Sequence, residues 1–416
     1  MLNAARKVIQ RTVGFVTRQK HNYRVAVTRS AGNNFLFKLT EQYDSIYTVA
    51  LGANSVELGI VSSIGNALST IIAVPVGWLV DRYGFRRFYL LGTGLLAGVA
   101  VIYAIAPSWH AIIFAMILYA VSIRLTGTGC SVVCTDSVRN RDRATAQNLC
   151  ATFSSILAMI APLLAAPLIT TFGGMTVEGI RPLYYIRVVG YGLIFFYVSS
   201  QLREFEGISK IKTTPHFIDD FKHLVKGNKT LQKWVFISSL TSLPMAMTPP
   251  FLQLFAHQVK GANQYVLGAM TTATVLARLL FGIPMGRLAD RIGRKKVIYL
   301  LTPLWYASHL LLIFSFNPVT LILSGALWTF YYINSGITGA MALELLPPEK
   351  MGKWSGLRGL FQGLVTIPAP ILGGLIWGEL GPMYVFFVPL VIDLFLRIPL
   401  LITVPETLNT DASINQ

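Results

Sequence analysis

Charged residues are scarce in this sequence, and acidic residues are scarcer still. Only 13% of the 416 residues are charged, with 18 Asp and Glu against 35 Lys and Arg, whereas 53% are hydrophobic. This composition excludes an ordinary soluble globular protein. Apolar runs of about 20 residues recur along the chain, and each is long enough to cross a ~30 Å hydrocarbon core as a helix. We therefore predict an all-α membrane protein that crosses the lipid bilayer many times.

Cysteines and catalytic patterns are also missing. The three cysteines, Cys130, Cys134 and Cys150, lie in or beside predicted spans and have no histidine or acidic partners. They make a poor metal site, and we interpret them as small buried hydrophobic residues. The sequence contains no GxSxG, HExxH or glycine-rich phosphate loop, and its six histidines are scattered. We expect no enzymatic activity, no cofactor and no bound metal.

The formal charge of +17 is placed in alternate loops. Most basic residues fall near the N-terminus and in five segments: 82–87, 139–143, 203–233, 287–296 and 350–358. This is the positive-inside pattern of a multi-pass protein. It predicts a plasma-membrane protein with both termini in the cytoplasm, and it accounts for the charge without a nucleic-acid partner.

The apolar runs predict twelve helical spans in two halves. Residues 1–29 form a basic cytoplasmic segment, either a short helix on the inner leaflet or a disordered tail, and they lack the apolar core of a signal peptide. Further divisions are a six-helix half over 30–202, a cytoplasmic loop over 203–233, a second six-helix half over 234–404 and a cytoplasmic tail over 405–416. The predicted spans lie near 30–51, 56–80, 88–105, 109–133, 145–172, 183–202, 234–257, 265–289, 297–316, 319–343, 354–377 and 384–404. The seventh is interrupted by Pro244 and by Pro249-Pro250.

One segment occurs twice, once in each half. Residues 77–87 read GWLVDRYGFRR and residues 286–296 read GRLADRIGRKK, each following a proline by two positions. Both copies hold a glycine suited to close contact, an acid, a glycine suited to a tight turn and a cluster of cations. The duplication continues, because APLLAA at 161–166 aligns with APILGG at 369–374. Small residues at this spacing allow helices to approach closely in lipid.

These motifs resemble those of the major facilitator superfamily of secondary transporters. The repeated segment is similar to the family's signature loop between helices 2 and 3, with its echo between helices 8 and 9, although Phe85 stands where a basic residue is usual. Residues 369–374 resemble the family's GPxxGG pattern. The resemblance implies twelve helices in two pseudo-symmetric halves, a central cavity lined by helices 1, 4, 7 and 10, and helices 3, 6, 9 and 12 outside them.

The resemblance also implies a cytoplasmic gate. It places Asp81 against the start of helix 11, near residues 353–355, and Asp290 against the start of helix 5, near residues 143–145. Asp136 and Glu344 occupy equivalent positions, and we expect each to pair with a loop arginine of its own half or, alternatively, to be a solvated helix end. The predicted gating residues are Gly77, Asp81, Arg82, Gly84, Arg86, Asp136, Gly286, Asp290, Arg291, Gly293, Arg294 and Glu344.

Ionisable residues inside spans are costly in lipid and usually face a cavity or one another. In the first span, Asn34, Lys38, Glu41, Gln42 and Ser45 fall within about a 100° arc, with Asp44 at its edge. We expect this stripe to face the cavity. The alternative is that Lys38 and Glu41, three residues apart, only neutralise each other.

Other spans carry further candidates for the substrate path: Arg124, Arg278, Tyr332, Asn334 and Gln362. Arg124 precedes TGTG and is similar to the RxxxGxG pattern of proton-coupled drug exporters, but one residue out of register; it faces the cavity or extends to the interface. Asp393 and Arg397 in the last span are four residues apart, and we interpret them as a structural pair.

The sequence therefore predicts secondary active transport of a small organic solute by alternating access, coupled to protons through Glu41 or Asp44. The cations of the spans favour an anionic substrate. A drug-type proton antiporter is the alternative. A non-transporting receptor on the same fold is disfavoured, because the C-terminal tail is short. The expected partners are the lipid bilayer, the small-molecule substrate and protons, with the protein a monomer.

Overall fold

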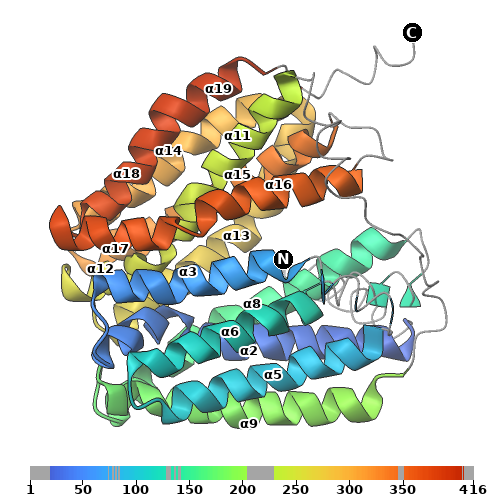
Figure 1. Ribbon diagram of the computed structural model, residues 1–416, viewed down its shortest axis with the longest axis vertical. Coiled ribbons are helices and arrows are strands. Elements are labelled where there is room, and N and C mark those ends of the chain that lie inside the picture. The colour runs from blue at the N-terminus through green and yellow to red at the C-terminus, as the bar shows by residue number, and fades with distance from the viewer. Residues whose placement is uncertain are drawn as a thin grey trace, which may run out of the picture. The chain divides into compact units, whose positions relative to one another are not determined.

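The computed structural model describes residues 19–73, 75–76, 79, 82, 85–127, 133–134, 137–138, 142–203, 229–344, 351–404 and 406. Every regular element among these residues is helical (Figure 1). Nine of the described helices are both long enough and apolar enough to cross a membrane. The predicted all-α, multi-span membrane fold is confirmed.

Each of the twelve predicted spans has a helical counterpart. The first six spans correspond to α2 (His21–Ala50), α3 (Ser55–Ile71), α5 (Phe85–Ile105), α6 (Trp109–Thr126), α8 (Arg143–Thr171) and α9 (Val177–Gln201). The last six correspond to α11 (Lys229–Met247) with α12 (Pro249–Gln258), α13 (Gln264–Ile292), α14 (Arg294–Ile313), α15 (Pro318–Glu344), α16 (Met351–Thr366) with α17 (Ala369–Glu379), and α18 (Tyr384–Ile392) with η3 (Asp393–Arg397) and α19 (Ile398–Ile402).

The start of the first span differs from the prediction. α2 begins at His21 instead of near residue 30, so the last part of the predicted N-terminal segment is helical. Its polar side chains have partners elsewhere in the fold. Tyr23 is fully buried and donates its hydroxyl hydrogen to the Ala146 carbonyl (2.8 Å), and Arg29 is buried as well. Hydropathy alone does not detect such a helix, because tertiary hydrogen bonds compensate for the polarity.

Proline divides two of the spans. Thr248 separates α11 from α12, and Pro249 and Pro250 occupy the first turn of α12, which confirms the interruption predicted there. The interruption predicted at Pro244 is wrong, because Pro244 lies inside α11, which continues to Met247. A second break, not predicted, lies at Pro368 between α16 and α17. Proline lacks a backbone N–H and disfavours helical geometry in the residue before it, so each break falls where a helix must restart.

The chain divides into two compact units, residues 1–41 with 71–212 and residues 42–70 with 213–416. In the first unit, α5 packs against α6 and α9, and α8 packs against α9. One core cluster of this unit includes Tyr23, Phe85, Tyr89, Cys134 and Cys150. The last two are buried, as the sequence predicts.

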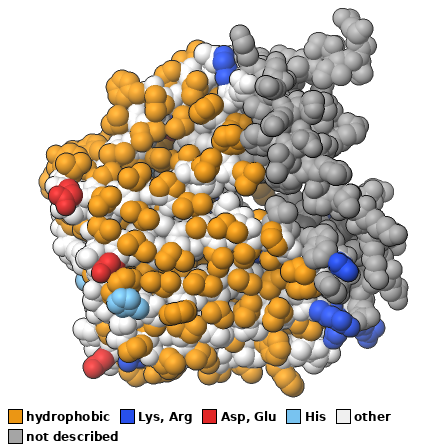
Figure 2. Space-filling model, viewed as in Figure 1, with side chains coloured by type: hydrophobic (Ala, Val, Ile, Leu, Met, Phe, Trp, Pro, Cys, Tyr) orange, Lys and Arg blue, Asp and Glu red, His pale blue; other side chains and the backbone are white. Residues whose placement is uncertain are grey.

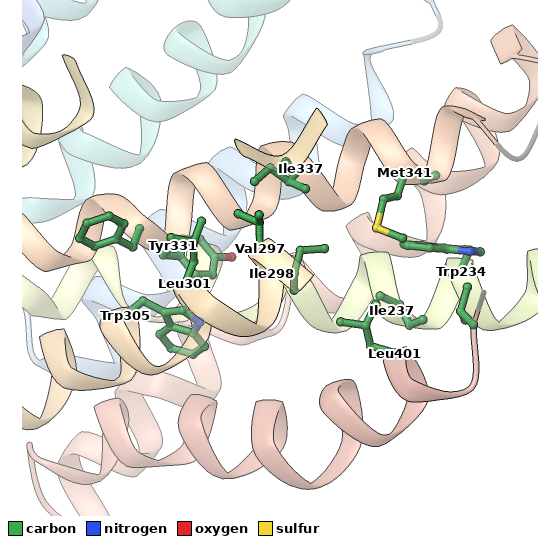
Figure 3. Packing of buried hydrophobic residues seen from close by; sticks show 14 of the residues in the cluster. Trp234, Ile237, Val297, Ile298, Leu301, Trp305, Tyr331, Ile337, Met341 and Leu401 are labelled. Atoms are coloured by element: carbon green, nitrogen blue, oxygen red, sulfur yellow. The ribbon is translucent and has the colours of Figure 1, made fainter. Parts of the chain in front are cut away.

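In the second unit, α15 packs between α13 and α14, and α11 packs against α16. Its core is rich in aromatic residues and includes Trp234, Trp305, Tyr331 and Met341, which Figure 3 labels. Trp328 belongs to the same cluster. The Trp328 and Tyr331 rings are stacked with their centroids 4.8 Å apart. Both rings lie on α15, and Trp305 of α14 packs edge to face on Tyr331 with the ring centroids 5.6 Å apart, so this contact between large buried rings holds α14 against α15.

The repeated small-residue motif brings α17 into close contact with α3 in the second unit. Ser55 donates its hydroxyl hydrogen to the Gly374 carbonyl (3.0 Å), and a Cβ on Gly374 would lie 2.8 Å from the Val56 Cα. A Cβ on Gly59 would lie 2.9 Å from the Ile371 Cα. The predicted close approach of helices at residues 369–374 is confirmed, and it explains why α3 belongs to this unit.

The described surface is that of a protein in lipid. Figure 2 shows hydrophobic side chains over most of the visible described face, with few charged ones among them. Phe196, Phe316 and Val319 are 71%, 94% and 71% exposed. Apolar side chains exposed on this scale have a favourable environment in hydrocarbon and an unfavourable one in water.

Candidate substrate path and gating residues

Lys38 and Glu41 form an ion pair on α2. The Lys38 Nζ donates to the Glu41 Oε2, and the two side chains keep 25% and 36% of their surface exposed. The pair is therefore neutralised and still accessible, and its position on the face of a central cavity stays a prediction. A cation and an acid that remain accessible within a span are able to exchange partners with a solute or a proton.

The other residues of the polar stripe differ in burial. Gln42 is 1% exposed, and Asp44 is half-buried with its backbone carbonyl accepting a hydrogen bond from the Thr48 hydroxyl (2.7 Å). Asn34 lies at the other end of the stripe and lines a cavity of about 270 Å³ within the first unit. The side chains of Asn34, Lys38 and Glu41 are thus partly exposed, whereas that of Gln42 is buried.

Arg124 lies in the last turn of α6 and is exposed. The packed face of that helix is made by its neighbours Ser122 and Leu125, and Ser122 donates its hydroxyl hydrogen to the Gly92 carbonyl (2.6 Å). Arg124 is absent from the lining of the first unit's cavity, to which α6 contributes Thr126 instead. This geometry favours the interpretation that the side chain extends away from the helix packing.

Arg278 and Tyr332 come together in the second unit, although they lie on different helices. The Arg278 guanidinium carbon is 5.2 Å from the centroid of the Tyr332 ring, a cation–π distance. Their helices are held close by hydroxyls, since Thr274 donates to the Gly325 carbonyl (2.6 Å) and Thr329 donates to the Thr274 carbonyl (2.6 Å). Arg278 is exposed and Tyr332 is half-buried, so this contact is accessible from outside the core.

Asn334 has a packing role instead of an open one. It is 2% exposed, and its Nδ2 donates to the Thr302 hydroxyl (3.1 Å) and the Ile298 carbonyl (3.4 Å) on α14. Gln362 is half-buried and donates to the Ser238 carbonyl on α11 (3.2 Å). The hydrogen bonds of the buried Asn334 stabilise the interface of α14 and α15. Gln362 makes one bond to α11 and keeps part of its surface exposed, so its place in the substrate path stays a prediction.

Asp393 and Arg397 form the predicted pair, and both are almost fully buried. Arg397 donates twice to the Asp393 carboxylate, and Tyr306 donates to the same carboxylate (2.6 Å). The segment from Asp393 to Arg397 is a π-helical turn, η3. These contacts join the last span to α14 and satisfy most of the lone pairs of the buried carboxylate.

The first copy of the signature loop is described only in part. Gly77, Asp81, Gly84 and Asp136 lie outside the described residues, as does the side chain of Glu344. Arg82 is exposed. Arg86 donates to the carbonyls of Leu202 (2.8 Å) and Ser199 (3.4 Å) at the end of α9. A cation at the C-terminus of a helix is favoured by the helix dipole.

The second copy of the loop is described completely. Gly293 has φ of 107°, which confirms the predicted tight turn. Asp290 lies 3.6 Å from Arg294 and its side chain is 66% exposed, and Arg291 is exposed. Within its own unit, Gly286 has no described neighbour within 4 Å of where a Cβ would stand, so this unit does not supply the expected close contact there.

Two residues that sequence patterns did not single out belong to these sites. Glu406 accepts backbone hydrogen bonds from Arg294 (3.2 Å) and Lys295 (3.0 Å) at the start of α14. Arg29 lines the cavity of the first unit and is 6% exposed. Glu406 follows the last apolar run and Arg29 precedes the first predicted one, so neither appeared as an intramembrane charge. No group of three or more metal-binding side chains occurs among the described residues.

Comparisons with known proteins agree with this architecture. A family model described as Major Facilitator Superfamily matches residues 39–264 and 234–413. The chain is 24% identical over 374 residues to the multidrug resistance protein MdtG of Escherichia coli, covering 86% of this chain and 88% of that one. It is 29% identical over 177 residues to the class B tetracycline resistance protein of Escherichia coli, a match that spans 40% of this chain and 41% of that protein.

Solved structures show the same fold. The nucleoside transporter NupG superposes with a TM-score of 0.73 at 15% identity, covering 93% of this chain and all of that one. A POT family transporter in complex with 5-aminolevulinic acid superposes with a TM-score of 0.71 at 12% identity, covering 95% of this chain and 96% of that one. At these identities the likeness establishes the fold alone.

Proposed function

The chain belongs to the Major Facilitator Superfamily and is a multi-pass membrane transporter rather than an enzyme, and from that premise we propose that it moves a small organic anion by alternating access, coupled to protons. The observation that carries the proposal is the accessible ion pair of Lys38 and Glu41 within a span. Cations at Lys38 and Arg278 support an anionic substrate.

The coupling follows from competition for Lys38. While Glu41 is ionised, it neutralises Lys38 and leaves no free cation for a substrate. An anionic solute that binds Lys38 displaces the carboxylate, and a proton then takes the place of Lys38 as the carboxylate's partner. Substrate and proton therefore load together and leave together. Asp44 lies one turn further along the same helix and is the second candidate for the proton site.

The test is uptake into proteoliposomes driven by a pH gradient, in the parent protein and in the variant Glu41→Gln. A panel of carboxylates and organic phosphates identifies the solute that accumulates. We expect Glu41→Gln to equilibrate that solute without accumulating it against its gradient. Accumulation equal to the parent would exclude Glu41 as the coupling site, and Asp44→Asn, measured in parallel, shows whether the neighbouring acid has that role.

A drug-type proton antiporter is the second candidate function. It is supported by the similarity of the chain to the multidrug resistance protein MdtG and to the class B tetracycline resistance protein. The direction of transport separates the two proposals. An antiporter expels a cationic or neutral drug as protons enter and lowers the susceptibility of cells that express it, whereas the proposed symporter concentrates an anion and leaves drug susceptibility unchanged.

A further inference from the structure

The cavity of the first unit lies where α2, α5 and α6 face one another. Its wall on α2 includes Arg29, Asn33, Asn34 and Phe37, a set with the three- and four-residue steps of one helical face. At about 30 Å³ per water molecule, its volume of 270 Å³ has room for roughly nine waters or for one small organic solute.

Arg29 is a buried cation that has no anionic partner among the described residues. Its Nε donates to the Thr93 hydroxyl (3.2 Å), and its guanidinium carbon lies 4.5 Å from the centroid of the Tyr89 ring. The hydrogen bond uses one of the five N–H groups of the guanidinium. No carboxylate in the described part of the chain forms an ion pair with Arg29. Burial of a cation is unfavourable unless an anion compensates for the lost hydration.

The second unit contains the matched case. Arg397 is 1% exposed, and its charge is compensated by Asp393, which is 3% exposed. Arg29 is buried to a similar degree. However, Arg29 faces a cavity, whereas Arg397 faces a carboxylate. The cavity at Arg29 thus takes the place of the missing anion.

The remaining lining residues indicate the body of the ligand. Asn33 and Asn34 supply amide groups that both donate and accept hydrogen bonds. Beyond them, the rings of Phe37 and Tyr119 are parallel within 2° with centroids 6.0 Å apart, and they present a flat apolar wall. Arg29 and Phe37 are separated by roughly 12 Å along the helix axis at 1.5 Å per residue.

We propose that this cavity binds a small planar organic anion, with its anionic group at Arg29 and its flat body against Phe37 and Tyr119. The inference rests on the proposed function, because it names the substrate class and because Asn34 belongs both to the cavity and to the polar stripe that continues to Lys38. A carboxylate or a phosphate forms two parallel hydrogen bonds with a guanidinium, and a planar ring packs well on aromatic side chains.

The test is equilibrium binding to the purified full-length protein, with benzoate and phenyl phosphate as planar anions and benzamide as their neutral counterpart. We expect at least one of the two anions to bind the parent protein and benzamide to bind at least tenfold more weakly. Arg29→Gln should weaken binding of the anion at least tenfold, and Arg29→Lys should retain part of it. Arg24→Gln removes an exposed arginine of the same helix, α2, that does not line the cavity, and it should leave binding unchanged.

A second variant keeps the proposal testable if Arg29→Gln does not fold. Asn34→Phe places a ring in the cavity without altering the charge, and it should also weaken the anion at least tenfold; the unfolding midpoint without ligand shows that the variant is intact. The proposal is overturned if neither anion binds the parent, or if Arg29→Gln and Asn34→Phe bind the anion as tightly as the parent. It is likewise overturned if only vesicles of phosphatidylglycerol, and neither soluble anion, bind in an Arg29-dependent way.

Transport is measured separately, so that failure of this site and failure of the proposed function are distinguishable. Arg29-dependent binding of the anion without any accumulation driven by a pH gradient would support the site and contradict the function. Accumulation of an anion that is unaffected by Arg29→Gln would support the function and contradict the site.

Discussion

The Glu406 carboxylate accepts a hydrogen bond from the backbone N–H of Lys295 (3.0 Å), and through this contact the chain beyond the last span caps the first turn of α14. Arg294 donates its backbone N–H to the other carboxylate oxygen (3.2 Å). In return, the Lys295 ammonium donates to the carbonyls of Ile402 (2.9 Å) and Val404 (2.8 Å). The second signature loop and the end of the chain therefore hold each other in place.

Replacement of Glu406 by glutamine should destabilise the protein. A carboxylate at a helix N-terminus satisfies exposed N–H groups and is favoured by the helix dipole, so its loss should cost about 1 kcal/mol. The measurement is the thermal unfolding midpoint of purified protein at low salt. Glu379→Gln is the control, since Glu379 is an exposed acid in the last turn of α17. Equal midpoints for the two variants would contradict the capping role.

Gly293→Ala should lower the stability of the protein at least as much as Glu406→Gln does. Gly293 has φ of 107°, and a Cβ there would lie 2.8 Å from the Glu406 Oε2. The backbone conformation alone costs an alanine about 1 kcal/mol. Gly282→Ala, in the middle of α13 with no neighbour within 4 Å of the added Cβ, is the control and should be neutral or slightly stabilising. An unfolding midpoint of Gly293→Ala equal to that of the parent protein would show that the backbone of this turn is not constrained.

Two ion pairs with the same four-residue spacing should differ strongly in their effect on stability. Asp393 and Arg397 are 3% and 2% exposed, whereas Asp290 and Arg294 are 66% and 15% exposed. Asp393→Asn leaves a buried guanidinium uncompensated and should cost about 3–5 kcal/mol. Asp290→Asn removes a screened surface interaction and should cost less than about 1 kcal/mol.

Chemical unfolding of both variants in detergent measures the difference. The double variant Asp393→Leu with Arg397→Met should recover much of the lost stability, because replacement of a whole buried pair by apolar residues is often neutral. Equal losses of stability in Asp393→Asn and Asp290→Asn would show that the buried pair contributes little, and that the hydrogen bond from Tyr306, which an asparagine can still accept, is the stabilising contact.

The glycine motif of α17 gives a third prediction. A Cβ on Gly374 would overlap the backbone of α3 at Ser55, and backbone atoms cannot move aside as a side chain can. Gly374→Ala should therefore reduce the free energy of unfolding by about 1–3 kcal/mol. Gly359→Ala, in the preceding helix with open space around it, should leave stability unchanged or slightly raised. A neutral Gly374→Ala variant would mean that α3 and α17 are separated more widely in the membrane.

Much of the fold could be predicted from the sequence, because the signals for it are local. Twelve apolar runs, the proline pair at Pro249 and the glycine of the tight turn at Gly293 each act on a few neighbouring residues. The repeated small-residue motif at 369–374 also predicted close helix packing, since the absence of side chains is itself the cause of the contact.

The partners of polar side chains could not be predicted in the same way. Asn334 has the polar side chain expected of a residue that lines a cavity, but its hydrogen bonds go to Thr302 and Ile298 on the neighbouring helix. Glu406 lies 112 residues beyond Arg294, and no local pattern reports their contact. Arg29 was assigned to a basic N-terminal segment because its charge interrupts the hydropathy of α2, and only the packing against Tyr89 shows that it is inside the fold.

Arg278 and Tyr332 provide a fourth prediction, about substrate recognition. If their cation–π contact is accessible to an anionic solute, as the proposed function requires, Arg278→Gln should raise the KM for transport at least tenfold with a smaller change in kcat. Tyr332→Phe retains the aromatic face and should behave like the parent, whereas Tyr332→Leu should resemble Arg278→Gln. Initial rates of uptake into proteoliposomes measure both constants, and a parent-like KM in Arg278→Gln would remove this arginine from the substrate path.

The last prediction concerns the gate implied by the signature loops. Asp81 lies outside the described residues. Among the described residues of its own unit, Asp290 has only the distant contact with Arg294, so the prediction that its carboxylate meets the N-terminus of another helix stays open to test. An acid at the C-terminal end of its own helix is disfavoured by the dipole, and exposed N–H groups elsewhere would compensate for this. We expect Asp81→Asn and Asp290→Asn each to shift the resting population toward the inward-open state.

Spin-label distances between the two halves on the loop side should lengthen in both variants. They should stay constant in the control Glu178→Gln, since Glu178 is an exposed acid in the first turn of α9. Distance distributions identical to the parent in both variants would show that these acids do not hold the gate closed.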